Sequence, residues 1–266
     1  VLDENQAEHY CIFRKVQKSS YNSNEDYEYA EKKQTLRIRD MARYGICVTL
    51  VDEYTEITEI LQRIASTVRR NNIFISGSAA EYNGWGEDNA LELSRKLAES
   101  LVRENFRITS GFGLGIGSAI INGALSEIYR SKYKNVDKYL CLRPFPQNIK
   151  DKERRQALFK KYREDMISDT GIAIFLFGNK RSSDNSSTII EAPGCWEEFE
   201  IAKANKNYII PIASTGWMAK QIFDEIKRDI GKYRYMKEYV DFFEKSKDID
   251  AIVKAVVDIA KKERSV

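Results

Sequence analysis

The chain has 266 residues and carries 43 Lys and Arg against 40 Asp and Glu, which gives a net charge of +3. This balance argues against a large nucleic-acid-binding face, and a hydrophobic content of 42% is enough for a full-sized globular core. The longest apolar run, residues 172–177, is too short to span a membrane. Four scattered cysteines without a C-x-x-C pair predict a reduced, cytoplasmic protein with no metal site.

Residues 1–69 have an incomplete α/β pattern. The spacing predicts a polar loop over 17–26, strands over 10–16 and 46–51, and helices over 29–44 (stopped by Gly45) and 53–69. Two βα units alone cannot bury both faces of a sheet. We therefore expect this segment to be the C-terminal remnant of another α/β domain whose beginning precedes the chain. The only histidine, His9, lies in it, and we expect no catalytic role for that residue.

From Asn72 onward, short apolar strands alternate with helices. We expect strands over 73–75, 106–109, 138–142, 171–177 and 208–212, with a polar loop over 179–188. We expect helices over 117–130 and 153–168, and three more that begin near residues 87, 193 and 216. The tail over 233–266 is expected to form one or two amphipathic helices. This alternation predicts an α/β fold: a Rossmann-like, doubly wound parallel sheet over residues 70–266, preceded by the partial α/β segment.

Two small-residue turns follow strands of this predicted sheet. In such sheets ligands bind at the carboxyl ends of strands, where glycine turns expose backbone N–H groups at helix N-termini. The first turn comprises Ser76, Gly77, Ser78 and Ala79, and the second includes Gly113, Leu114, Gly115, Gly117 and Ser118. We expect these residues to hold phosphate and ribose. The alternative is that the turns only pack helix against strand, because the G-x-G-x-x match is loose.

Charged residues cluster on the other half of the predicted sheet. Arg143, Arg163 and Lys180 follow or precede strands and are candidates to neutralise phosphate. Three glutamates, Glu191, Glu197 and Glu198, surround a Pro-Gly turn that contains Gly194. We expect this group to contact the ligand, with one of the glutamates accepting hydrogen bonds from ribose hydroxyls. Solvated surface charge, or acidic residues complementing a helix dipole, is the alternative.

The segments 163–166, 172–178 and 193–198 together resemble the LOG-type nucleotide phosphoribohydrolases. In that family an Arg-containing helix precedes an aliphatic strand, a P-G-G-x-G-T loop and a Glu pair. Here Phe177-Gly178-Asn179 replaces Pro-Gly-Gly, polar residues are inserted, and the Gly-Thr is absent. With these departures, the sequence resembles the LOG-like sensor domains called SLOG or STALD. Such domains are found in sirtuin-like and TIR-associated Thoeris effectors of bacterial anti-phage defence. The stretches 72–79, 109–118, 142–146 and 191–198 carry this resemblance, and residues 9–68 resemble the end of a sirtuin-like NAD-hydrolysing domain.

The resemblance implies a regulatory domain that binds a cyclic ADP-ribose isomer, activates a linked NAD hydrolase and assembles as a homo-oligomer. No cofactor and no catalytic residue are expected in this chain, because NAD is the substrate of the preceding domain. We expect no nucleic-acid or membrane partner. The alternative function is a LOG-like phosphoribohydrolase that acts on AMP or a related nucleoside monophosphate with Arg163 and Glu197 or Glu198.

Overall fold

The computed structural model describes residues 9–264 apart from 133, 147, 183 and 186. The chain divides into two compact units, Val1–Ala65 and Ser66–Val266. None of the helices among the described residues is both long and apolar enough to cross a membrane.

The first unit contains a two-stranded parallel sheet of β1 (His9–Arg14) and β2 (Ile46–Val51). Helix α1 (Asn24–Arg43) begins at Asn24, earlier than predicted, because the Ser23 hydroxyl oxygen accepts a hydrogen bond from the Asp26 N–H and caps it. Gly45 ends the helical segment as predicted, with a φ of +74°. Short 3₁₀ turns, Lys18–Ser20 and Tyr54–Glu56, precede α1 and α2 (Ile57–Arg70).

The second unit is built on a parallel sheet in the order β5-β4-β3-β6-β9. Its strands are β3 (Asn72–Ser78), β4 (Arg107–Ser110), β5 (Leu140–Leu142), β6 (Ile172–Phe177) and β9 (Tyr208–Pro211). The chain runs from β3 outward to β5 and then returns to β6 on the other side of β3, so the direction of winding reverses at β3. This is the predicted Rossmann-like, doubly wound α/β fold.

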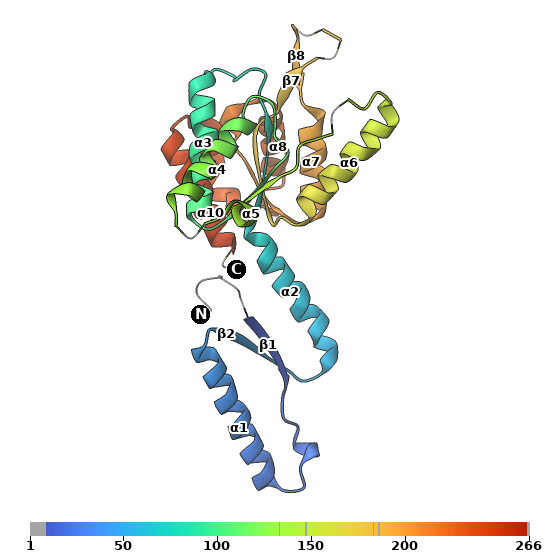
Figure 1. Cartoon of the computed structure of the whole chain (residues 1–266), viewed down its shortest axis with the longest axis vertical. Coiled ribbons are helices and arrows are strands. Elements are labelled where there is room, and N and C mark those ends of the chain that lie inside the picture. Colours follow the sequence, from blue (N-terminus) through green and yellow to red (C-terminus); the bar gives the residue numbers. More distant parts are fainter. Residues whose placement is uncertain (1–8, 133, 147, 183, 186, 265–266) are drawn as a thin grey trace. The chain divides into compact units, whose positions relative to one another are not determined.

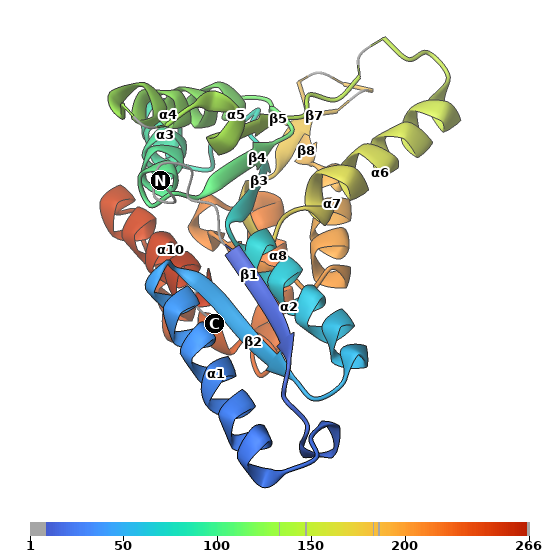
Figure 2. The ribbon, with the colours of Figure 1, turned by 60° about the horizontal axis from the view of Figure 1, so that its bottom comes forward.

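Helices cover both faces of this sheet (Figures 1 and 2). On β6, Ile172, Ile174 and Leu176 join one apolar core with helices α3, α4 and α10, whereas Ala173 and Phe175 join a second core with α7 and α8. The helices are α3 (Glu87–Arg103), α4 (Gly117–Arg130), α6 (Lys152–Ser168), α7 (Pro193–Ala204), α8 (Trp217–Arg228), α9 (Val240–Lys245) and α10 (Ile249–Arg264). Alternate residues of one strand thus supply the two cores, as expected of a buried parallel strand.

Two local predictions were wrong. Residues 136–139 form a helical turn, α5 (Val136–Tyr139), instead of the start of a strand, because the Asn135 side chain accepts a hydrogen bond from the Lys138 N–H and caps that turn. The predicted polar loop after β6 contains an antiparallel hairpin of β7 (Asn179–Arg181) and β8 (Ile189–Glu191). Residues 183 and 186 of that loop lie outside the described residues. Figure 1 shows the hairpin projecting beyond the end of the sheet.

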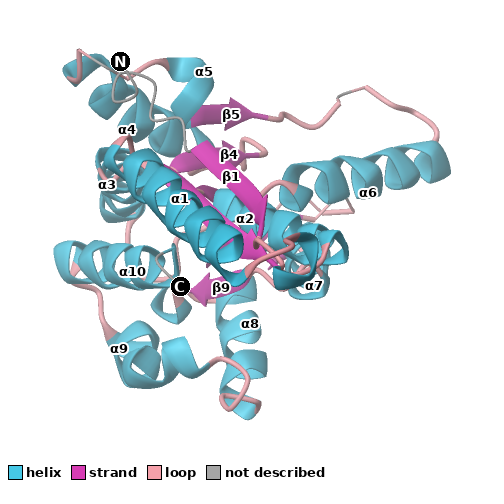
Figure 3. Cartoon of the chain, turned by 90° about the horizontal axis from the view of Figure 1, so that it is seen from below, coloured by secondary structure: helices cyan, strands magenta, loops and turns pink. Residues whose placement is uncertain are grey.

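The C-terminal tail packs on the domain, as predicted. After a 3₁₀ segment, Arg234–Tyr239, α9 and α10 form the two expected helices (Figure 3). The predicted apolar positions Ile252, Val256 and Ile259 of α10 are buried in the first core, against α3. The amphipathic pattern of the tail therefore reflects burial within the same unit.

Candidate ligand-binding cavity

A cavity of about 480 Å³ lies at the carboxyl ends of β3, β4 and β6. This is the point where the strand order reverses, which is where open α/β sheets bind ligands, and the volume lies in the usual range for small-molecule sites. Its lining includes nine predicted residues: Ser76, Gly77, Ser78, Gly113, Leu114, Arg163, Lys180, Gly194 and Glu198. Both predicted glycine turns and the charged cluster therefore meet in one cavity.

The two glycine turns are in direct contact. The Ala79 N–H donates a hydrogen bond of 2.8 Å to the Leu114 carbonyl oxygen. A Cβ atom at Gly113 would lie inside the van der Waals radius of the Gly77 carbonyl oxygen, so the close crossing requires glycine at this position. The two crossing turns form the floor of the cavity, and Gly113 allows them to come this close.

A buried carboxylate links β3 to the charged cluster. The Ser76 hydroxyl donates to one oxygen of Glu198 at 2.5 Å, and Arg163 Nε donates to the other oxygen at 3.3 Å. Glu198 is only 8% exposed, and burial raises the pKa of its carboxyl, while the hydrogen bond from Ser76 and the charge of Arg163 oppose that shift. The cavity thus contains a carboxyl group that takes up a proton more readily than an exposed one.

Arg163 is held by four neighbours. Its Nη1 contacts Glu197 Oε2 at 2.7 Å, and its guanidinium lies 5.0 Å from the ring centroid of Phe145 and 6.0 Å from that of Phe159. The fourth is Glu198, and the guanidinium also packs against Gly194 at the start of α7, where a Cβ would make it shift. The predicted cation therefore lines the cavity, already paired with both predicted glutamates.

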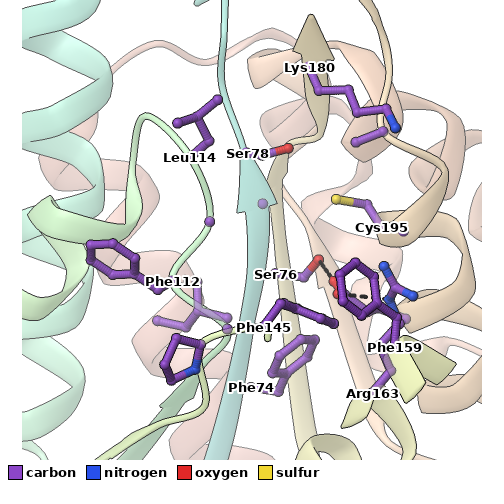
Figure 4. A pocket seen from close by; sticks show the side chains of 18 residues that line it. Phe74, Ser76, Ser78, Phe112, Leu114, Phe145, Phe159, Arg163, Lys180 and Cys195 are labelled. Atoms are coloured by element: carbon purple, nitrogen blue, oxygen red, sulfur yellow. Dashed lines mark hydrogen bonds and ion pairs between the residues drawn. The ribbon is translucent and has the colours of Figure 1, made fainter. Parts of the chain in front are cut away.

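Lys180 reaches the cavity from the hairpin. Its neighbour Asn179 is fully buried and accepts hydrogen bonds from the Ala80 N–H (2.8 Å) and the Glu81 N–H (3.0 Å). The Ser78 hydroxyl donates to the Asn179 carbonyl oxygen at 2.9 Å. These bonds anchor the hairpin to the segment that follows β3, and they place the exposed Lys180 side chain on the cavity wall (Figure 4).

Several cavity residues were not predicted. Phe112, Phe145 and Phe159 form an aromatic part of the lining, and Cys195 faces the cavity beside Ser76. Burial raises the pKa of the Cys195 thiol to about 12. The positions of Phe112 between glycines and Phe145 between prolines were the available sequence signals, since bulky residues within turns often serve a site.

Seven predicted site residues do not line this cavity. Four of them belong to or follow the glycine turns: Ala79, Gly115, Gly117 and Ser118, of which Ser118 borders a separate shallow pocket beside Arg95. Arg143 is exposed after β5. Glu191 and Glu197 border a neighbouring groove with Trp196 and Met218, although Glu197 still pairs with Arg163.

Among the described residues, no group of three or more His, Cys, Asp or Glu side chains is placed to hold a metal ion. The groups that line the cavity include two cations, one buried carboxyl, two serine hydroxyls, one thiol and several aromatic rings.

The family pattern of the Sir2- and TIR-associating SLOG proteins, STALD, matches residues 56–263. The chain belongs to the STALD family. Proteins named NAD(+) hydrolase ThsA are similar to it over almost its whole length. The relative from Acinetobacter baumannii is 41% identical over 97% of this chain and 55% of its own length, and that from Bacillus cereus is 36% identical over 96% and 54%. The relative from Enterococcus faecium is 40% identical over 88% of this chain and 48% of its own length.

This STALD chain thus spans about half the length of the relatives that it matches, and over that length it is ThsA-like. The resemblance to SLOG sensor domains noted from the sequence is confirmed by the family match. The cavity lies within the matched residues, so its glycine turns, Arg163 and Glu198 are part of the STALD domain.

Proposed function

We propose that this chain is the ligand-sensing part of an NAD hydrolase in Thoeris anti-phage defence and that its cavity binds a cyclic ADP-ribose isomer. The observation that carries the proposal is the cavity at the reversal point of a STALD domain, lined by two glycine turns and by Arg163 and Lys180. Such a ligand has two phosphates, two riboses and an adenine, which require cations, backbone donors and an apolar surface together. The ThsA name of the relatives supports the same reading.

In this proposal, residues 1–69 belong to the NAD-hydrolysing domain, and NAD is the substrate of that domain and not a cofactor of this chain. Ligand binding rearranges a cytoplasmic homo-oligomer and thereby releases NAD hydrolysis. An approaching phosphate competes with Glu197 and Glu198 for Arg163, since both carboxylates already contact its guanidinium. Binding and rearrangement of the charged cluster are therefore coupled.

Calorimetric titration with cyclic ADP-ribose isomers tests this function. Charge-assisted contacts to phosphate contribute roughly 1.5–3 kcal/mol each, so Arg163→Ala should weaken binding by about tenfold or more. The affinity of Arg163→Lys should lie between those of the parent and Arg163→Ala, because a lysine keeps the positive charge but lacks the planar guanidinium. Arg228→Ala, which removes an arginine with 77% of its side chain exposed, is the matched control. Unchanged affinity in Arg163→Ala would contradict the proposal.

A second function is favoured by one observation, the raised pKa of the buried Glu198 in the cavity, because perturbed carboxyls are common among catalytic acids and bases. The function is that of a LOG-like phosphoribohydrolase that releases the base from AMP or a related monophosphate. Incubation with AMP and chromatographic detection of free adenine distinguishes the two functions. Steady turnover that is lost in Glu198→Gln would establish hydrolysis and remove the sensor-only proposal.

A further inference from the structure

The cavity has two chemically different sides. Lys180, Cys195 and Arg163 lie on one side of the end of β3, and Phe112 and Leu114 lie on the other side, on the glycine turn after β4 (Figure 4). The charged side offers cations to phosphate groups. The opposite side offers apolar surface, with Phe112 52% and Leu114 65% exposed.

The aromatic rings of the cavity are not equally available to a ligand. Phe145 and Phe159 pack edge to face with centroids 4.9 Å apart, and the Arg163 guanidinium lies over both. Phe112 takes part in no such ring or cation contact within the described part of the chain. Of these three phenylalanines, Phe112 is therefore the one whose ring is left open.

Phe112 is also held in an unfavourable backbone conformation. Its φ of +59° lies in the left-handed region, where the backbone of a bulky residue is strained. The turn enforces this conformation, because Gly117 packs so closely on the Phe112 backbone that a Cβ there would lie 2.9 Å from the Phe112 carbonyl carbon. The chain thus carries both backbone strain and a half-exposed aromatic ring at the rim of a cavity.

We infer that Phe112 is the base-stacking residue of this cavity and makes it prefer ligands that carry a nucleobase. The base lies on the Phe112 ring with Leu114 beside it, and the phosphates point across the end of β3 towards Arg163 and Lys180. Every nucleobase has a flat face that stacks favourably on an aromatic side chain. This inference rests on the proposed function and assigns the two halves of its ligand to the two sides of the cavity.

The test compares probes with and without a base in the full chain. Cyclic ADP-ribose isomers, AMP and ribose 5-phosphate are titrated by calorimetry into the parent protein, Phe112→Asn and Phe112→Trp. Asn tolerates the left-handed region, so Phe112→Asn should fold with an equal or higher melting temperature. The Phe112→Asn substitution should weaken the binding of the base-containing probes by about tenfold and the binding of ribose 5-phosphate by less than about twofold. Phe112→Trp should restore the affinity for AMP, and its tryptophan fluorescence should be quenched by AMP.

Equal weakening of all three probes would overturn the inference, because Phe112 would then only shape the turn. Unchanged affinity for AMP in Phe112→Asn would overturn it as well. If the parent binds AMP with the predicted dependence on Phe112 but does not bind any cyclic ADP-ribose isomer, base stacking stands and the proposed signal ligand fails. If it binds none of the probes, both proposals fail.

Discussion

At the scale of single residues, the buried Glu198 makes the stability of the fold depend on pH. Burial raises the pKa of this carboxyl above its value in the unfolded chain. The protonated form therefore favours the folded state, and its contribution is present below the unfolded pKa and is lost as the pH rises through the folded pKa. The ionised carboxylate, held by Ser76 and Arg163, is the form that persists at higher pH.

We predict that the parent protein gains stability relative to Glu198→Gln as the pH falls from about 8 to about 5, because only the parent can take up the proton. Urea unfolding at each pH measures the difference in the free energy of unfolding. Glu197→Gln, which alters a glutamate whose side chain is 54% exposed, is the control. A difference between the parent and Glu198→Gln that does not change with pH would contradict the prediction.

The crossing of the two glycine turns gives a second prediction at this scale. Gly113→Ala forces a Cβ against the Gly77 carbonyl oxygen, and such overpacking costs about 1–3 kcal/mol. The melting temperature should fall, and ligand affinity should fall with it because the turns form the floor of the cavity. Gly231→Ala has no atom within 4 Å of the new Cβ and should leave both measurements unchanged. A Gly113→Ala protein as stable as the parent would disprove the steric argument.

The sequence predicted the polar half of the cavity better than its apolar half. Gly113, Arg163 and Glu198 belong to residue types whose place after or between strands has a direct chemical reading. Phe112 and Phe145 are chemically ambiguous, because a phenylalanine in a turn can pack in the core or line a site. That both line the cavity depends on backbone geometry, such as the positive φ of Phe112, which sequence spacing does not encode.

At the scale of elements, the β7–β8 hairpin depends on a single buried side chain. Asn179 accepts from two backbone N–H groups and donates to the Glu81 carbonyl oxygen at 2.7 Å. Asn179→Ala leaves these groups unpaired and should lower the free energy of unfolding by about 2 kcal/mol. It should also weaken ligand binding, because Lys180 is carried by the same strand.

Thermal melts and titrations with a cyclic ADP-ribose isomer measure the two effects. Asn185→Ala is the matched control in the same hairpin, since its side chain is exposed and its amide oxygen accepts a hydrogen bond from the nearby Ser187 N–H. If Asn179→Ala binds ligand like the control, the hairpin does not position Lys180.

Long elements were predicted well and short ones poorly. The periodic face of α3, with Ala90, Leu93 and Leu97 fully buried, and the continuous apolar run of β6 follow directly from spacing. Hairpin strands β7 and β8 have three residues each, too few for an alternating pattern. The hairpin is anchored by Asn179, whose side-chain hydrogen-bond partners lie about a hundred residues earlier and are invisible to local sequence analysis.

At the scale of the whole molecule, the two units differ greatly in their cores. In the described residues of the first unit, only Val51 and Ile60 are buried apolar side chains, whereas the second unit has two extensive apolar clusters. A folded unit needs a substantial buried core to offset the loss of chain entropy. The second unit meets this requirement by itself.

We predict that a fragment of residues 66–266 folds alone, with a melting temperature within a few degrees of the full chain and the same ligand affinity. A fragment of residues 1–65 should show little helical signal by circular dichroism, because it buries too little apolar surface. A cooperative melting transition in the smaller fragment would contradict this prediction.

The four free thiols lie at graded depths across the molecule. Cys47 is exposed, Cys11 and Cys141 are partly covered, and Cys195 is buried in the cavity wall with a pKa of about 12. Only a thiolate reacts readily with iodoacetamide, so Cys47 should be alkylated first and Cys195 last. The delay before Cys195 is labelled, followed by mass spectrometry, therefore reports how rarely its thiol is both accessible and ionised.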